Sequence, residues 1–524
     1  MQILIGPIHM PIRHTEEEVF CAAQEIVRLH CVLAADFWIY KQSLDARRKG
    51  NIHYVYQVAA TVQEGICSES ETIRPLKTTG EMEIPRVSPP IVRPVVVGMG
   101  PCGLFAAYVL AKAGACPLLI ERGEDVDRRA AEVARFWNGG KLNPESNVQF
   151  GEGGAGTFSD GKLNTRIGDP RQRYVLKTFV RHGAPKDILY RAKPHIGTDC
   201  LRPVVRSMRE EIIRLGGAVR FSTCLTDIRA EHGRLAAITV NHDEQIACER
   251  LILALGHSSR DTYRLLERRG IAMQPKAFAA GVRVEHPQQM IDRTQYGNEG
   301  LGLPAADYRL VHNGRERSCY SFCMCPGGRV VNASSEPEHL VVNGMSEYRR
   351  DLENANSALV VSVRPEDFDG DGILSGMEFQ RRYEAAAWHN GGGDGAAPVQ
   401  CVRDFMTDHM SDRLRETNPS FTGKWRFAML RDCLPPFIVQ GLKEGLVDFE
   451  RKMPGFSKQG IMTGVEMRTS APVRILRDAS LKSVSHDGLY PAGEGAGYAG
   501  GIVSAAVDGI RVAMEILAQI GIDK

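Results

Sequence analysis

The stretch from Pro94 to Gly123 constrains the fold of this chain more than any other. A short apolar run, Val95–Val97, is followed by a Gly-x-Gly-x-x-Gly spacing, a helix-forming segment and a second apolar run that ends at Glu121. This order of strand, tight turn, helix, strand and acid is the context in which the dinucleotide-binding fingerprint occurs. We therefore predict a Rossmann-like unit that binds a dinucleotide.

Each part of this fingerprint has a physical role. Gly98 allows the tight turn, Gly100 leaves room for a pyrophosphate, and Gly103 lets the helix approach the strand closely. The free N–H groups at the helix start provide positive potential for the phosphates. Glu121 can accept hydrogen bonds from a ribose diol, and its charge would repel a ribose 2′-phosphate.

A second glycine-rich stretch, Asn147–Arg166, reads NVQFGEGGAGTFSDGKLNTR. Its glycines, mixed with Ser, Thr and Asp, argue against a regular helix or strand. A flexible surface loop is the simpler interpretation. The flanking apolar residues Val148, Phe150 and Leu163 instead favour a structured loop whose backbone closes on the cofactor.

The C-terminal stretch Pro491–Leu517 carries a third glycine-rich motif, PAGEGAGYAGGI, followed by an apolar helix that starts near Gly501 and Ile502. Glu494 is placed to accept a hydrogen bond from a ribityl hydroxyl or a phosphate-linked water. The helix start would stabilise negative charge at a flavin pyrimidine edge. This motif argues against a flavin-free, NAD-dependent dehydrogenase, and it predicts that both ends of the chain close one FAD-binding domain.

The fold class that we predict is α/β: a three-layer Rossmann-like FAD-binding domain, an inserted α+β substrate domain and a small N-terminal α+β domain. In the N-terminal domain, Met1–Gly6 and Asn51–Val62 are expected strands, and Glu16–Leu33 is an expected helix. The predicted boundaries are 1–83 for the N-terminal domain, 84–94 for a Pro-rich linker, 95–275 and 463–524 for the FAD-binding domain, and 276–462 for the substrate domain.

Composition restricts the partners of the chain. The 65 basic and 63 acidic residues leave a net charge of +2, so there is no strong nucleic-acid signal. The basic segment Tyr40–Lys49, expected to be a loop, could contact RNA or an anionic partner, although a solvated face is the commoner role. Without an apolar leader or a membrane span we expect a cytoplasmic protein that does not bind a membrane. Isolated cysteines such as Cys21, Cys31 and Cys116 are expected to be buried thiols.

Several long motifs together carry a family resemblance: GMGPCGLFAAYVLAKAG, FGEGGAGTFSDGKLNTR, HIGTD, ALGHSSRDTY, SFCMCPGGRVVNASSE, TGVEMRTSAPVRI and LYPAGEGAGYAGGI. The whole chain resembles the bacterial family of uncharacterised FAD-dependent, or NAD(FAD)-utilising, dehydrogenases, which is related to flavoproteins of the glutathione reductase and hydroxybenzoate hydroxylase type. The resemblance implies FAD as the cofactor but no particular substrate. Because no second complete fingerprint occurs, NAD(P)H would act only as a transient co-substrate at the isoalloxazine.

The resemblance implies that FAD is held by residues matching Gly98, Gly100, Gly103, Glu121, Gly154, Gly493, Glu494 and Ile502. The motifs around these positions extend the predicted set of cofactor contacts. The full set is Gly98, Gly100, Pro101, Cys102, Gly103, Glu121, Arg122, Gly153, Gly154, Thr157, Ser159, Asp160, Gly256, His257, Gly493, Glu494, Gly501 and Ile502.

Two features are weaker candidates for catalysis. His257 follows the apolar run Arg250–Leu255 and is either a contact for flavin or substrate, or a structural residue. Cys323 and Cys325 form a C-x-C pair, which is poorly suited to a relaxed disulfide and lacks the arrangement that lowers a thiol pKa. A structural role is therefore the favoured interpretation of the cysteine pair. His257 and Cys325 are the two weak catalytic candidates, and Cys325 is the weaker of them.

The segment Asp367–Glu378 matches the calcium-loop pattern position by position. That pattern needs an entering helix, whereas the preceding residues read as a strand that ends at a proline. The acids also suit an ordinary loop and helix cap. We assign no metal site.

The sequence thus predicts an FAD-dependent oxidoreductase that transfers a hydride between a small-molecule substrate and flavin N5, with NAD(P)H, quinone or oxygen as the other electron partner. His257, Ser159 and Asp160 are the polar groups expected near the ring. The alternative is a flavin-bearing binding or RNA-modification-associated protein that uses its basic N-terminal domain for the partner. The sequence sets no oligomeric state.

Overall fold

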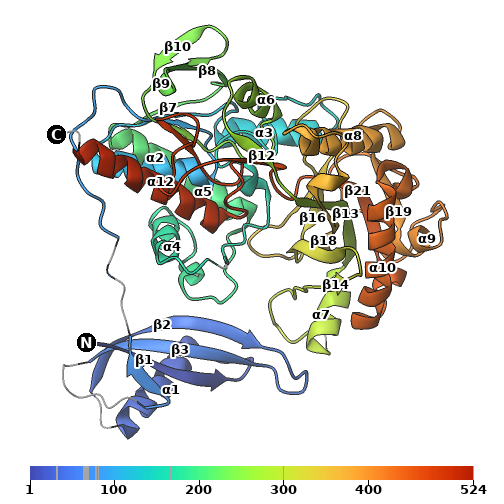
Figure 1. Ribbon diagram of the computed structural model, residues 1–524. Coiled ribbons are helices and arrows are strands. Elements are labelled where there is room, and N and C mark those ends of the chain that lie inside the picture. The colour runs from blue at the N-terminus through green and yellow to red at the C-terminus, as the bar shows by residue number, and fades with distance from the viewer. Residues whose placement is uncertain are drawn as a thin grey trace.

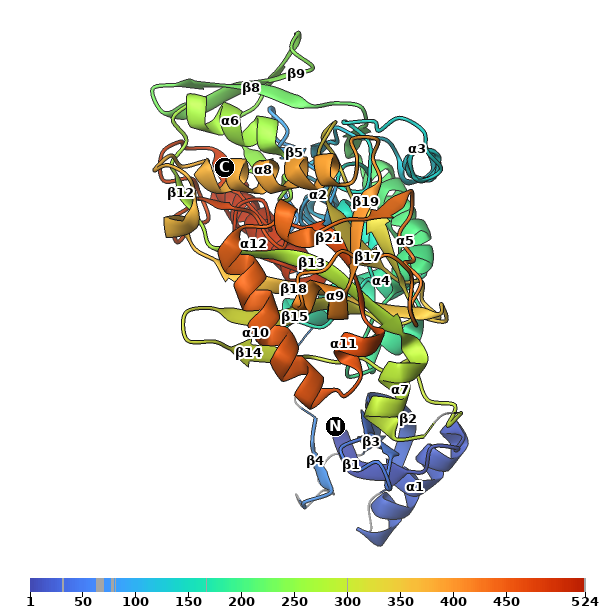
Figure 2. The same cartoon turned by 90° about the vertical axis from the view of Figure 1, so that its right-hand side faces the viewer.

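The computed structural model describes residues 1–30, 33–62, 70–76, 80, 82–165, 167–298 and 300–522 (Figure 1). Two large sheets form the main body, and the N-terminal unit lies beside it, as both views show (Figures 1 and 2). No described helix is both long and apolar enough to cross a membrane.

A five-stranded parallel sheet is the centre of the first half of the body, with the order β23-β11-β5-β6-β7. Its short strands are wholly apolar and buried except at the β7 edge, as expected for a sheet covered on both faces. The strands are β5 (Val95–Val97), β6 (Leu118–Ile120), β7 (Ala218–Arg220), β11 (Leu251–Leu253) and β23 (Leu489–Pro491). Because β23 comes from near the C-terminus, both ends of the FAD-binding part complete one sheet, as predicted.

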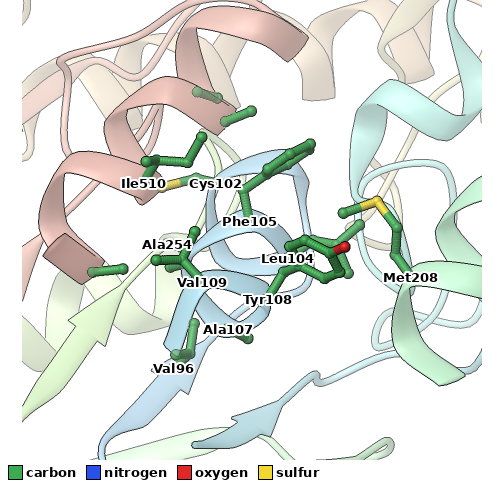
Figure 3. Close-up of a cluster of buried hydrophobic side chains, with 14 of the residues drawn as sticks. Val96, Cys102, Leu104, Phe105, Ala107, Tyr108, Val109, Met208, Ala254 and Ile510 are labelled. Carbon is green, nitrogen blue, oxygen red and sulfur yellow. The ribbon is translucent and has the colours of Figure 1, made fainter. Parts of the chain in front are cut away.

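Helices cover one face of this sheet. The central helix α2 (Pro101–Ala113) packs between α12 (Ile502–Ile522) and α5 (Gly197–Arg214), and nearly all of its side chains are buried (Figure 3). Phe105 and Val109 belong to this core. Further helices of this half are α3 (Val126–Trp137), α4 (Arg171–Arg181) and α6 (Arg260–Arg268).

A three-stranded antiparallel sheet forms the third layer. Its strands β8 (Leu225–Glu231), β9 (Arg234–Val240) and β10 (Glu244–Ala247) join β7 to β11. Ile228 and Ile238 from this sheet share an apolar core with the outward face of the parallel strands. The three-layer, Rossmann-like fold predicted from the sequence is therefore confirmed.

A seven-stranded, mostly antiparallel sheet is the centre of the second half, with the order β14-β15-β18-β13-β21-β19-β20. Its strands are β13 (Phe278–Pro287), β14 (Val311–Asn313), β15 (Ser318–Cys325), β18 (Asn354–Val363), β19 (Ala397–Cys401), β20 (Trp425–Phe427) and β21 (Ile461–Glu466). The predicted end of the substrate domain, residue 462, lies inside β21. The domain boundaries otherwise stay predictions.

Helices α8 (Ser375–Asn390) and α10 (Pro436–Lys452) pack against this second sheet through one shared apolar core. The remaining short elements of this half are α7 (Gln288–Tyr296), α9 (Val402–Met406), α11 (Phe456–Gln459), β16 (Arg329–Asn332) and β17 (Val342–Met345). A small ladder of β12 (Met273–Pro275) and β22 (Val473–Ile475) lies where the chain enters and leaves this half.

The N-terminal unit is a four-stranded antiparallel sheet with one helix, so its predicted α+β character is correct. The elements are β1 (Gln2–Met10), α1 (Glu16–Leu29), β2 (Ala34–Asp45), β3 (His53–Val62) and β4 (Ile73–Pro75). The helix starts at a capping box between Thr15 and Glu18 and ends four residues before the predicted Leu33. Residues 31 and 32 lie outside the described part of the chain.

The basic segment Tyr40–Lys49 differs from the loop that the sequence suggested. It forms the last part of β2 up to Asp45 and then the β2–β3 turn, because it pairs with β3. Arg47 donates two hydrogen bonds from Nε to Asp45, at 2.9 and 3.1 Å, so its charge is already paired.

The same strand ties the N-terminal unit to the body. Gln42 N donates to the Tyr190 carbonyl at 2.8 Å, and Ala192 N donates to the Gln42 carbonyl at 2.8 Å. Leu44 packs against the core of the seven-stranded half, whose buried members include Ile52, the residue before β3. The linker residues 84–94 have no helix or strand.

The expectation that isolated cysteines are buried holds only in part. Cys116 is half-buried, but Cys21 is exposed. Helix α1 buries only the stripe formed by Val19, Ala23 and Val27, and Cys21 lies off that stripe. Cys31 lies outside the described residues.

Close contact between β5 and α2 generates the first prediction. A Cβ atom added to Gly103 would lie 1.9 Å from the Gly98 carbonyl oxygen. We expect Gly103→Ala to lower the free energy of unfolding by at least about 2 kcal/mol, because the helix must move away from the strand. Gly168→Ala is the matched control, since its added Cβ meets no atom within 4 Å. Equal denaturant midpoints for the two variants would contradict this packing.

Candidate functional site

A cavity of about 1000 Å³ runs from the glycine-rich turn after β5 to the seven-stranded sheet. The carboxyl ends of β5 and β11 open into it, which is where ligands bind in open parallel sheets. Most of the predicted cofactor contacts line this cavity. They are Gly98, Gly100, Pro101, Cys102, Glu121, Arg122, Gly154, Ser159, Asp160, Gly256, His257, Glu494, Gly501 and Ile502, and the catalytic candidate Cys325 also lies on the wall.

The other predicted contacts, Gly103, Gly153, Thr157 and Gly493, are not on the wall of the cavity. They shape the loops behind it. A Cβ added to Gly153 would lie 2.0 Å from Thr157 Oγ1, and one added to Gly493 would lie 2.8 Å from the Cβ of Cys102. Glycine at 153 and 493 therefore allows these loops to pack closely against their neighbours.

The turn before α2 has the form of a phosphate site. Gly100 caps the helix without a side-chain hydrogen bond, so the first N–H groups of α2 are available to a ligand. Gly154 faces Gly100, and a Cβ added to Gly154 would lie 2.8 Å from the Gly100 Cα. Two backbones lined by glycine at the start of a helix fit a diphosphate, whose oxygens accept from bare N–H groups.

The second glycine-rich stretch is a structured loop, as predicted, and the buried Arg129 holds it. From α3, the guanidinium donates to the carbonyls of Asn147 at 2.8 Å, Val148 at 2.9 Å and Glu152 at 2.7 Å. Sequence reasoning missed Arg129, because a single arginine in a polar helix carries no signal of its own. Arg166, the last residue of the predicted stretch, lies outside the described residues.

Glu121, which the sequence predicts to accept from a ribose diol, also holds two loops together. Its carboxylate accepts hydrogen bonds from the backbone N–H groups of Met99 at 2.8 Å, Gly151 at 2.9 Å and Gly123 at 3.0 Å. It therefore joins the first glycine turn to the second loop. A carboxylate has about four lone-pair sites, so one remains for a ribose hydroxyl.

Glu494 lies on the cavity wall, and burial raises its pKa to about 7, although Lys276 acts in the opposite direction. The sequence suggested only an acceptor at this position. A carboxyl that is partly protonated at neutral pH can also donate a hydrogen bond to an anionic ligand. Nearby, Gly501 and Ile502 place the start of α12 at the cavity, as predicted.

Asp160 is buried and held by two cations. Arg350 Nε and Lys162 Nζ each donate to its carboxylate at 2.8 Å. Burial alone would raise the pKa of Asp160, but Lys162 and Arg350 together hold it well below its usual range. A carboxylate that stays ionised and is clamped in this way positions the loop and does not exchange protons.

His257 is buried beside two arginines. Its Nδ1 lies 2.9 Å from the Ser258 hydroxyl. Burial and the positive charges of Arg468 and Arg260 lower the pKa of His257 to about 3. The imidazole is therefore neutral at physiological pH and can orient a ligand by hydrogen bonding, but it carries no positive charge there.

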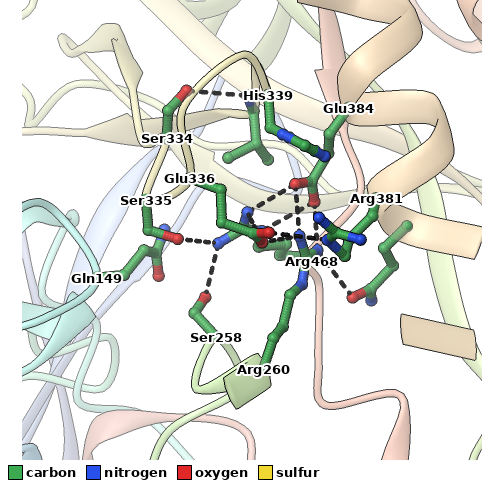
Figure 4. Close-up of polar contacts among 12 residues, drawn as sticks. Gln149, Ser258, Arg260, Ser334, Ser335, Glu336, His339, Arg381, Glu384 and Arg468 are labelled. Atoms are coloured by element: carbon green, nitrogen blue, oxygen red, sulfur yellow. Dashed lines mark hydrogen bonds and ion pairs between the residues drawn. The ribbon is translucent and has the colours of Figure 1, made fainter. Parts of the chain in front are cut away.

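An ion-pair cluster that sequence reasoning missed reaches Ser258, the residue after His257 (Figure 4). Glu384 of α8 accepts two hydrogen bonds from Arg260 of α6, at 2.7 and 2.9 Å, and two from Arg468, at 2.6 and 2.8 Å. Arg468 also donates to Ser335 at 2.6 Å and to Ser258 at 3.1 Å. The only sequence signal was that both arginines lie within motifs quoted for the family resemblance.

The C-x-C pair lies beside a second buried ion pair. Arg283 Nη1 lies 2.8 Å from the Glu466 carboxylate, and Arg283 Nη2 lies 3.3 Å from Cys325 Sγ. Cys325 is buried, and burial raises the pKa of its thiol. Cys323 is exposed. A protonated thiol at neutral pH is a poor nucleophile, so the geometry favours the structural interpretation of Cys325.

Three of the four acids of the calcium-like pattern, Asp367, Asp369 and Glu378, pair with arginines. Asp367 lies 2.5 Å from Arg317, and Glu378 lies 2.6 Å from Arg264. Among the described residues, no group of three or more His, Cys, Asp or Glu side chains has an arrangement that could hold a metal ion.

Comparisons with known proteins agree with this geometry. Residues 277–469, which span the seven-stranded half, match the family described as "FAD-dependent protein, C-terminal domain-like". An uncharacterised protein of Clostridium beijerinckii is 52% identical over 502 residues, which cover 93% of each chain. The chain belongs to the same family. It is an FAD-binding flavoprotein, since the matched family is FAD-dependent and the cavity fits that cofactor.

More distant similarities were also found for this flavoprotein. A thiamine thiazole synthase of Aeropyrum pernix is 28% identical over 189 residues, which cover 33% of this chain and 58% of the synthase. The FAD complex of a glycerol-3-phosphate dehydrogenase from Bacillus halodurans has a TM-score of 0.36 at 11% identity, covering 82% of this chain and 64% of that chain. A geranylgeranyl bacteriochlorophyll reductase-like protein of Thermoplasma acidophilum has a TM-score of 0.35 at 14% identity, covering 82% and 79%.

The flavoprotein's ion-pair cluster generates a stability prediction. Glu384→Gln leaves Glu336, whose side chain is 24% exposed and which also pairs with Arg381, as the remaining charged partner of the two buried guanidiniums, so we expect a loss of about 3 kcal/mol in the free energy of unfolding. Glu378→Gln on the same helix is the control, because its side chain is 48% exposed and such pairs contribute about 0–1 kcal/mol. Denaturant unfolding measures both. Similar losses for the two variants would contradict a central role for Glu384.

The Glu384 carboxylate also predicts part of the loss in the free energy of unfolding at low pH. Burial would raise its pKa, but Arg260 and Arg468 lower it to about 2. Because the folded value is depressed, its stabilisation is complete above the unfolded pKa of about 4.3 and is lost as pH falls toward 2. In Glu384→Gln, this component of acid destabilisation should be absent.

Glu494 predicts a pH dependence of the opposite sign. Its raised pKa means that the folded cofactor-free protein keeps a proton which the unfolded chain releases near pH 4.3. The resulting stabilisation is lost as pH rises through about 7, by up to about 3 kcal/mol between pH 4 and pH 8. Subtracting the pH profile of Glu494→Gln from that of the wild type isolates this loss. Parallel profiles would show that Glu494 titrates normally.

Proposed function

We propose that this flavoprotein is an oxidoreductase that exchanges a hydride between FAD and a small organic substrate. One observation carries the proposal: a single cavity joins the diphosphate-shaped turn of the parallel sheet to the face of the seven-stranded sheet. A cofactor with a dinucleotide at one end and a redox ring at the other suits a cavity of this extent. When bound, FAD supplies a hydride acceptor and donor.

The residues of this chain would divide the work along the cavity. The start of α2 and the glycine backbones bind the diphosphate, and Glu121 accepts from a ribose hydroxyl. The start of α12 provides positive potential at the ring end. His257 presents a hydrogen-bonding group on the wall beside the seven-stranded sheet, where a substrate would be oriented, and Arg468 holds the neighbouring Ser258.

We further propose that NADH or NADPH reacts as a transient co-substrate from the open side of the cavity. The support is that, of the Gly-x-Gly-x-x-Gly spacings in the chain, only the one at Gly98–Gly103 is followed by the helix, strand and acid of the complete dinucleotide fingerprint, and that its turn would be taken by FAD. The alternative of a partner-binding protein gains no support from Arg47, because Asp45 pairs with it.

The test uses the visible spectrum of the purified protein and its anaerobic reduction. We expect flavin absorbance that is released by denaturation, and bleaching on addition of NADH or NADPH under anaerobic conditions. Gly100→Val should fold but retain little FAD, because Gly100 lines the cavity and its added Cβ has the Gly154 Cα, at 3.9 Å, as its nearest contact. Gly168→Val is the control for a glycine substitution away from the cavity.

A colourless protein that FAD cannot reconstitute would contradict the proposal as a whole. Bound FAD that neither nicotinamide nor a panel of small organic reductants bleaches would contradict the oxidoreductase activity while leaving FAD binding intact. Full retention of FAD by Gly100→Val would show that the diphosphate lies elsewhere.

A further inference from the structure

One wall of the cavity is apolar and aromatic. Tyr320 and Phe322 of β15 line it and pack on the buried side chains of Ala279 and Val360 from the neighbouring strands. The alternate residue Cys319 faces the other side of the sheet, where a Cβ added to Gly445 of α10 would lie 2.5 Å from its sulfur. The two aromatic side chains are therefore turned toward the cavity.

A cation lies at the end of this aromatic wall. The Lys162 ammonium donates to the main-chain carbonyl of Met324, which is two residues after Phe322 on the same strand. The strand is irregular there, since the pairing register with β18 shifts between Phe322 and Cys325. This irregularity brings the carbonyl of the strand to the lysine.

The charge of Lys162 is only partly compensated. The Asp160 carboxylate accepts from both Lys162 and Arg350, and Arg350 makes two hydrogen bonds to it, at 2.8 and 2.5 Å. No other carboxylate pairs with either cation among the residues that the structure describes. One carboxylate thus faces two cations, and one positive charge remains.

Three other pairs of opposite charge near this part of the cavity are neutralised locally, whereas the exposed Arg309 also lines the cavity and adds a second positive charge to its wall. The pairs are Arg283 with Glu466, Arg468 with Glu384 and Asp307 with Lys193. An ammonium has three donors, and protein acceptors take two of those of Lys162. Its side chain is 33% exposed and lines the cavity, so the third donor is available to a ligand.

We propose that the substrate is an organic carboxylate with an apolar ring as its body. The carboxylate accepts from Lys162, and the ring packs on Tyr320 and Phe322. This inference deepens the proposed function, since it names the substrate class of the same cavity. A bound carboxylate would complete the two-cation, one-anion cluster, and charge-assisted hydrogen bonds are among the stronger polar contacts that a ligand can make.

The experiment measures binding and needs no turnover. The FAD-loaded protein is titrated with 2-naphthoate and with the neutral amide 2-naphthamide, which has a similar shape, by calorimetry and by the change in the flavin spectrum. We expect the carboxylate to bind at least about tenfold more tightly than the amide. Lys162→Met should abolish this preference, whereas Lys162→Arg should keep most of it. Phe322→Ala should weaken both ligands by a similar factor.

Lys141→Met, which removes an exposed lysine outside the cavity, is the matched control and should bind like the wild type. Equal affinity of the wild type for the two probes, or no binding of the carboxylate, would overturn the inference. So would a carboxylate preference that survives in Lys162→Met. If Lys162→Met loses FAD or alters the unliganded flavin spectrum and still prefers the carboxylate, Lys162 contacts the cofactor instead. Because no hydride transfer is measured, failure of the proposed activity would leave this result standing.

Discussion

The pairing of Glu384 with Arg260 and Arg468 is the interaction on which the rest of the structure depends. The three side chains come from α8, α6 and the segment after β21, so one buried carboxylate joins the parallel-sheet half to the seven-stranded half. Taking ions out of water is costly unless they are paired and hydrogen-bonded, and four hydrogen bonds to Glu384, together with the Glu336 carboxylate beside Arg260, provide that pairing here. The cluster thereby fixes the position of the two halves that form the cavity walls.

The chemistry of the cavity follows from this arrangement. Burial and the two arginines lower the pKa of His257 and keep it neutral, and the clamp on Asp160 keeps that acid ionised, so neither is set up to exchange a proton near neutral pH. Glu494 is different, since its pKa of about 7 lies close to the pH at which most enzymes work. His257 and Asp160 therefore keep fixed protonation states near neutral pH, whereas Glu494 does not.

Much of the fold could be predicted because backbone geometry leaves a local signature. The glycines at 98, 100 and 103, the acid at 121 and the helix start at 502 each follow from a requirement of the turn or the strand beside them. Side-chain clusters that join distant segments leave no such signature. Arg129, Glu384 and Lys162 are ordinary polar residues in the sequence, and only tertiary packing gives them their roles. The prediction of a loop at the basic segment Tyr40–Lys49 was wrong for the same reason, because pairing with β3 makes its first part a strand.

The central claim is that the cavity between the two sheets holds FAD, and a crystal structure of the protein purified with its cofactor tests it most directly. The account predicts density for FAD along the cavity, with the diphosphate at the start of α2 and the isoalloxazine toward the seven-stranded sheet. Density for FAD outside this cavity, or a different nucleotide within it, would contradict the account.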